Sequence, residues 1–242
     1  MKALNHAVPT VPKTPNSLQF VQRIIEKVNK KFEFIPSIAE NFNWYVEPSI
    51  ELTALKELFK SYNDETRVNE ILIKHYKENT TRILDDLKEK FPHRSNILEE
   101  IFFAHNNGFY YLSCIAFMTQ VDGVVYDFSD GKNYFHGTRE SNFFEETRAR
   151  LNSLDIESAG LYFLKQLFNN ELPIRIGPKK RTLEFEHMNR HQMLHGETTN
   201  FNTEINSLKA LSLLATLAFN LKYLDDILSN DEIKNNKYGD LI

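Results

Sequence analysis

The sequence predicts an all-α helical bundle with at most a short β-hairpin. Glycine and proline are scarce, at 8 each in 242 residues, and long stretches repeat apolar residues at helical spacing. So few turn-forming residues argue against a fold built from many short strands. A chain of this length can bury a substantial core and forms one large or two small domains.

Composition limits the classes of function. The formal net charge is −4, so no global positive field attracts nucleic acid or an anionic membrane, and any phosphate binding must be local. A single cysteine, Cys114, excludes an intramolecular disulfide framework and a cysteine-rich zinc module, and its apolar neighbours predict a buried thiol. No stretch approaches the ~20 apolar residues of a membrane span, and the start lacks the apolar segment of a signal peptide. We therefore expect a cytoplasmic protein without a membrane partner.

The first part of the chain begins with a proline-containing segment. Residues 1–16 are expected to form a flexible arm, and a helix is expected to begin near Ser17, whose hydroxyl can cap it. The aromatic segment 32–49, broken by two prolines, is expected to be a connector. Its Trp44 and Tyr45 are expected to plug the core.

Helices follow this connector. They are expected at residues 50–62 and 67–91, and then along the apolar region 95–125. The last of these has too few polar residues for a surface helix, so a central position is expected. Gly123 is expected to break it, which would place Asp122 at its end.

The remainder alternates loops and helices. A loop with at most a short hairpin is expected between residues 124 and 138, and a second loop at 171–181. Helices are expected at 141–151, at 157–170, at 182–194 with Gly196 as its stop, and from a cap at Thr203 onward.

The segment "MNRHQMLHGE", residues 188–197, concentrates the side chains that can carry chemistry. One interpretation is metal binding, because His187, His191 and His195 recur every four residues and would share one face of a helix. Glu184, one turn earlier, would be the nearest carboxylate. A second interpretation is structural: Arg190 would pair with Glu186, and His195 would lie at the helix C-terminus, where a cation is favoured.

A third interpretation is acid–base chemistry on a phosphodiester. Histidine exchanges protons near neutral pH, and the planar guanidinium of arginine matches phosphate oxygens. Together they suffice to cleave RNA without a metal ion, because the ribose 2′-OH is the nucleophile. DNA, which lacks this hydroxyl, would resist. Arg190 and His195 lie roughly 140° apart around an ideal helix, so they reach one groove only if the helix unwinds near Gly196, if the groove follows the helix edge, or if two copies pair.

The segment "NRHQMLHG", residues 189–196, resembles the Arg-x4-His signature of the HEPN superfamily, with Arg190 and His195 as its two ends. The upstream segment "FYYLSCIAFMTQVDGVV" also resembles a helix that precedes the motif in HEPN-like proteins of bacterial defence loci. The resemblance covers about residues 96–228. It implies a HEPN-like helical domain at 96–230. We expect an N-terminal helical region at 17–95 before it and a tail at 231–242 after it.

The resemblance also implies a function. HEPN proteins are typically small all-α bundles, and many are metal-independent ribonucleases that act as toxins or antiviral effectors, often as dimers with a composite site. By this resemblance Arg190 would hold the scissile phosphate and His195 would be the general acid or base. His191 and Asn189 would support them, and Asp122 would orient a histidine unless it is only a residue of the turn before Gly123.

These expectations extend to partners. The implied partners are RNA, a second copy of the chain, and an antitoxin or another protein of a defence system, with no cofactor and no metal ion. The basic residues just before the motif would anchor RNA phosphates, unless they form only a solvated loop: Lys179, Lys180 and Arg181. The alternatives are a non-catalytic helical module that dimerises or regulates a partner, and a metal-dependent hydrolase that would need His187, His191 and a carboxylate to converge.

Overall fold

The computed structural model describes residues 30–137, 142–154, 159–182, 185 and 187–229. These residues form helices and no β-strand, which confirms the all-α fold class. The expected arm at 1–16, the helix near Ser17 and the tail at 231–242 lie outside them.

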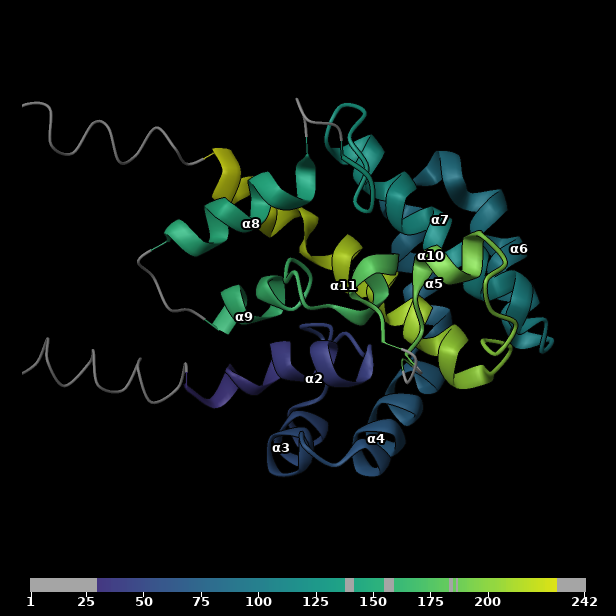
Figure 1. Cartoon of the computed structure of the whole chain (residues 1–242), viewed down its shortest axis with the longest axis horizontal. Helices are drawn as coiled ribbons and strands as arrows, with labels where there is room; N and C mark the ends of the chain where they lie inside the picture. The colour runs from purple at the N-terminus through teal and green to yellow at the C-terminus, as the bar shows by residue number, and fades with distance from the viewer. Residues whose placement is uncertain (1–29, 138–141, 155–158, 183–184, 186, 230–242) are drawn as a thin grey trace, which may run out of the picture.

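The helices surround one long central helix, α11 (Glu204–Ser229), which runs through the middle of the molecule (Figure 1). The other α-helices are α2 (Phe34–Phe42), α3 (Leu52–Ser61), α4 (Glu65–Glu78), α5 (Thr80–Lys90), α6 (Ser95–Asn106), α7 (Tyr110–Phe128), α8 (Phe143–Ser153), α9 (Ala159–Lys165) and α10 (Arg190–Leu194). Short 3₁₀ turns are η1 (Lys30–Phe32), η2 (Pro92–Arg94), η3 (Pro173–Arg175) and η4 (Pro178–Lys180).

Helix α11 is buried on nearly every side of its middle turns. It packs along α7 and also against α4, α5 and α9. Its leucines fill the core, and so do residues outside the single apolar face that the sequence shows, such as Leu213 and Leu217. A helix that is apolar all round belongs in the interior, which explains the central position of α11.

The segment before α3 crosses the core in an extended form. Trp44 and Tyr45 are fully buried, as expected, and the indole Nε1 of Trp44 donates to Asn69 Oδ1 at 2.7 Å. The side chain of Gln166 pairs with the backbone of Val46 in both directions, at 2.7 Å each. Asn43 donates from Nδ2 to the carbonyl of Met188 at 2.7 Å, so this segment also supports the chain just before α10.

Several expected boundaries were wrong. Part of the supposed connector at 32–49 is helical, because Pro36 falls in the first turn of α2, where a proline costs little. The single helix expected at 67–91 is divided into α4 and α5 at Asn79. The apolar region 95–125 is also two helices, and they turn at Gly108, whose φ of 79° favours glycine.

Gly123 does not end α7, which continues to Phe128. The guanidinium of Arg94 packs against this glycine, and an added Cβ would lie 2.4 Å from Arg94 Nη1. Gly123 is thus explained by a close side-chain approach within a helix. Asp122 consequently lies inside α7 and not at its end.

Candidate functional site

Helix α10 is much shorter than the expected helix at 182–194, because Asn189 starts it. The side-chain oxygen of Asn189 accepts from the backbone N–H of Gln192 at 3.2 Å, which is an N-cap. Its Nδ2 donates to the carbonyls of Pro173 at 2.7 Å and Ile176 at 2.9 Å. Asn189 is fully buried, so it is a positioning residue that fixes α10 against η3.

Arg190, the first residue of α10, faces α7. Its Nη2 lies 3.4 Å from Asp122 Oδ2, and its guanidinium carbon lies 5.3 Å from the ring centroid of Phe135. Asp122 Oδ1 accepts from the backbone N–H of Phe135 at 2.9 Å. The expected role of Asp122, to orient a histidine, is not seen: among the described residues its carboxylate contacts Arg190 and the backbone of Phe135. The Arg190 side chain is 26% exposed, so the guanidinium remains accessible from one side.

His191 and His195 form a second group at the other end of α10. Their ring centroids are 4.3 Å apart and their planes are tilted by 45°. His191 Nδ1 lies 2.9 Å from Glu197 Oε1. His195 is exposed and occupies the C-cap position, where its N–H donates to the carbonyl of His191 at 3.0 Å. Gly196 follows with a φ of 69°, which ends the helix.

Glu197 connects the two histidines to Arg181, the last residue of the basic run at 179–181. Its Oε2 lies 2.8 Å from Nη1 of Arg181. Loss of water around the carboxylate acts to raise its pKa, but the close contact and charge of Arg181, with the charge of His191, outweigh this and lower the pKa of Glu197. Arg181, Glu197, His191 and His195 therefore form a continuous chain of contacts in which Glu197 is a carboxylate at neutral pH.

The basic run divides between two environments. The Arg181 side chain is only 9% exposed and faces Glu197, so it has a structural role. Lys179 and Lys180 are exposed in η4 and line a shallow cavity of about 580 Å³ together with Arg175. Arg175 stacks on Phe144 at 3.5 Å from the ring centroid, which holds its charge in place at the cavity wall.

The metal-binding interpretation required His187, His191 and His195 to lie on one face of a single helix. His187 lies before α10, so the three histidines do not share one helix. In the described part of the chain, no three His, Cys, Asp or Glu side chains are grouped to hold a metal ion. Glu184 and Glu186, the carboxylates named for the metal and structural interpretations, lie outside the described residues.

Three contributors to this region were not selected from the sequence: Glu197, Arg175 and Phe135. Glu197 follows His195 by two residues, so proximity alone was a usable signal. Arg175 and Phe135 reach the region only through tertiary packing of loops, and no spacing pattern indicates them.

No described helix is long and apolar enough to cross a membrane. The chain matches no protein-family model, no curated protein and no solved structure. The functional conclusion therefore rests on the residues and their geometry.

Proposed function

We propose that the protein is a metal-independent endoribonuclease of the HEPN type that cleaves RNA through the 2′-OH. The observation that carries this proposal is the pair of imidazoles, His191 in α10 and His195 at its C-cap, whose ring centroids lie 4.3 Å apart, with a partly exposed arginine at the start of the same helix. Arg190 and His195 are five residues apart, which corresponds to about 7.5 Å along a helix. A guanidinium and two proton-exchanging groups thus belong to one short helix and its C-cap.

In the proposed reaction, His195 takes the proton of the 2′-OH as the oxygen attacks phosphorus. The bond from phosphorus to the 5′ oxygen breaks, and that oxygen receives a proton from His191. The products are a 2′,3′-cyclic phosphate and a 5′-hydroxyl. Glu197 orients His191 by its contact with Nδ1.

Arg190 would neutralise the charge that develops on the phosphate oxygens. Its contact with Asp122, at 3.4 Å, is longer than the about 2.7–2.9 Å of a strong charge-assisted hydrogen bond. Its Nε is buried and has no hydrogen-bond partner within the described residues, so a phosphate would be met by the terminal nitrogens. Asp122 therefore positions the guanidinium through a long contact to one of these nitrogens, Nη2.

The RNA strand would follow the cavity at η4. Lys179, Lys180 and Arg175 supply three positive charges there against the one carboxylate of Glu145. Asn189 ties η3, which contains Arg175, to the start of α10. Affinity from such phosphate contacts falls steeply as salt is raised. The toxin or antiviral setting and an inhibitory or defence partner are proposed from the resemblance of "NRHQMLHG" alone, and the cytoplasmic location is proposed from the composition of the sequence.

A second candidate is a non-catalytic helical binding module. The engagement of Arg190 by Asp122 and Phe135 favours it, because an arginine held between a carboxylate and a ring can serve packing alone. The two candidates differ in whether purified protein cleaves RNA.

The deciding experiment is incubation of the purified chain with total cellular RNA in excess EDTA, beside His195→Ala. His136→Ala is the matched control, since His136 is also exposed and lies outside α10. We expect cleavage by the wild type and the control but not by His195→Ala. Absence of cleavage by the wild type would favour the binding module, and loss of cleavage in EDTA alone would restore the metal interpretation.

A further inference from the structure

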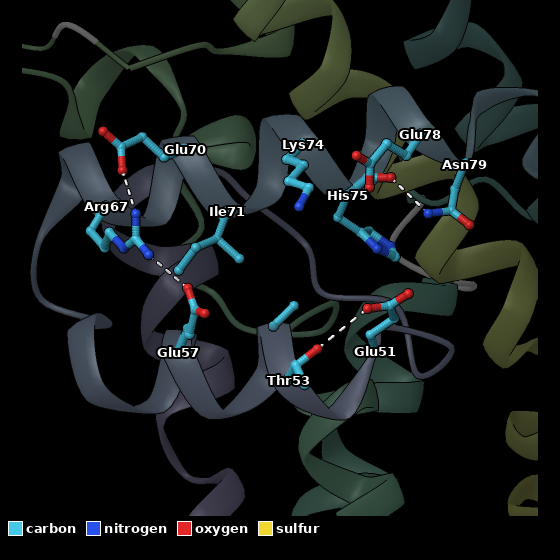
Figure 2. Close-up of a pocket in the computed structure, with 11 residues that line it drawn as sticks. Glu51, Thr53, Glu57, Arg67, Glu70, Ile71, Lys74, His75, Glu78 and Asn79 are labelled. Carbon is cyan, nitrogen blue, oxygen red and sulfur yellow. Dashed lines mark hydrogen bonds and ion pairs between the residues drawn. The ribbon is translucent and has the colours of Figure 1, made fainter.

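A pocket of about 390 Å³ lies between α3 and α4, separate from α10 (Figure 2). Ala54 and Ile71 give it an apolar wall. Carboxylates stand at both ends: Glu57 and Glu70 at one, and Glu51 and Glu78 at the other. Its volume is in the range of sites for small organic ligands.

The lining has an excess of negative charge. Four glutamates face two cations, Arg67 and Lys74, which leaves a formal charge of −2. Arg67 bridges Glu57 and Glu70 at 2.7 Å each and compensates one charge at that end. Lys74 lies on α4 between the two ends. The pocket is thus complementary to a cation.

His75 adds a hydrogen-bond acceptor to this lining. His75 is only 6% exposed, and its Nε2 lies 2.8 Å from Glu47 Oε1. Glu47, which also contacts Arg82, is a carboxylate that can only accept, so Nε2 carries the proton. In the neutral ring Nδ1 is therefore an acceptor. Among the described residues nothing donates to Nδ1, and the ring projects into the pocket toward Glu51 (Figure 2).

We propose that this pocket binds a linear aliphatic diamine. One ammonium group donates to His75 Nδ1 and to the carboxylates of Glu51 and Glu78, and the other pairs with the end at Glu57 and Glu70. The methylene chain lies along Ala54 and Ile71. Glu70 and Glu78 are eight residues apart on α4, or about 12 Å between Cα atoms.

Calorimetric titration of the full chain with 1,6-diaminohexane at low ionic strength tests the proposal, with 1,6-hexanediol as the uncharged match. We expect saturable binding of the diamine and none of the diol. The Glu51→Gln/Glu78→Gln variant should bind about tenfold more weakly or worse. The control Glu33→Gln/Glu100→Gln removes two exposed charges elsewhere and should bind like the wild type.

A ¹⁵N spectrum of the histidine side chains reports on the acceptor directly. Saturating diamine should shift the Nδ1 resonance of His75 and leave that of the exposed His136 unchanged. Equal binding of diol and diamine, equal weakening by both double variants, or a stationary His75 resonance would each overturn the proposal. None of these readouts depends on RNA cleavage, so they do not bear on the nuclease.

Discussion

At the scale of single residues, two contacts give the side chains of α10 their partners. Asp122 contacts Arg190 at 3.4 Å, and Glu197 contacts His191 at 2.9 Å. The first contact joins residues 68 apart in the chain, and no local pattern encodes such a pairing.

Replacement of the motif side chains should affect activity much more than stability. His195→Ala should cleave RNA roughly 10²–10⁴-fold more slowly, the usual loss when a general acid or base is removed. Arg190→Lys keeps the charge but loses the planar fork, so it should be strongly impaired as well. Because His195 is exposed, the free energy of unfolding of the His195→Ala protein should differ from that of the wild type by no more than about 0.5 kcal/mol.

Single-turnover cleavage of a short RNA, with urea unfolding of each variant, checks this prediction. A substrate with a 2′-deoxy residue at the scissile bond should remain intact. His195→Ala protein that is fully folded and fully active would remove His195 from the mechanism.

Glu47 gives the protein a pH-dependent stability. Burial acts to raise the pKa of this carboxyl, but the hydrogen bond from His75 and the charge of Arg82 outweigh it and hold the pKa below its usual value of 4.5. As the pH falls, Glu47 is therefore protonated in the unfolded chain at a higher pH than in the folded protein. The stabilisation is fully present above about pH 4.5 and is lost as the pH falls through the lower pKa of the folded state.

Glu47→Gln should destabilise the protein by about 1–3 kcal/mol at pH 7, because it removes the charge that His75 and Arg82 face in a buried site. The difference from the wild type should shrink as the pH falls below 4.5. Urea unfolding at a series of pH values measures it, with Glu100→Gln as an exposed control. A difference in unfolding free energy between Glu47→Gln and the wild type that stays constant down to pH 3 would contradict the lowered pKa of Glu47.

At the scale of elements, periodicity predicted where helices occur better than where they end. The break between α4 and α5 contains neither glycine nor proline. There Asn79 Nδ2 donates to the carbonyl of His75 at 2.9 Å, and Thr80 Oγ1 donates to that of Tyr76 at 2.8 Å. Such local side-chain bonds compete with the helix, and a hydrophobic pattern does not reveal them.

Gln166 illustrates how a polar residue can hold an element in the core. Its amide satisfies both the N–H and the C=O of Val46, in a place where neither reaches a backbone partner. Gln166→Leu keeps the volume but leaves both groups buried and unpaired, so we expect a loss of about 2–5 kcal/mol. Urea unfolding measures it, and Asn152→Leu, which changes an exposed amide, should stay within about 0.5 kcal/mol. Equal effects of the two changes would show that the pairing with Val46 contributes nothing.

At the scale of the whole molecule, the turn between α6 and α7 exposes a cluster of large apolar side chains. Phe103 is 64% exposed, Phe109 54% and Leu112 63%. The loop after α10 reaches the same end of α7, where Tyr111 donates to the carbonyl of Thr199, four residues beyond His195. A second copy that covers this cluster would also approach the loop that follows the histidines, which is what a site shared between two copies would need under the proposed function.

Dimerisation through this surface is therefore expected. Light scattering should give about twice the 28.4 kDa of one chain at high concentration. Leu112→Glu should shift the protein to monomer and lower its cleavage rate, because a charge placed within an apolar interface loses its water. Leu52, equally exposed at 64% but on α3, provides the matched control, and Leu52→Glu should leave both the mass and the rate unchanged. A wild-type monomer that cleaves RNA at full rate, or dissociation caused equally by both changes, would contradict a composite site at this surface.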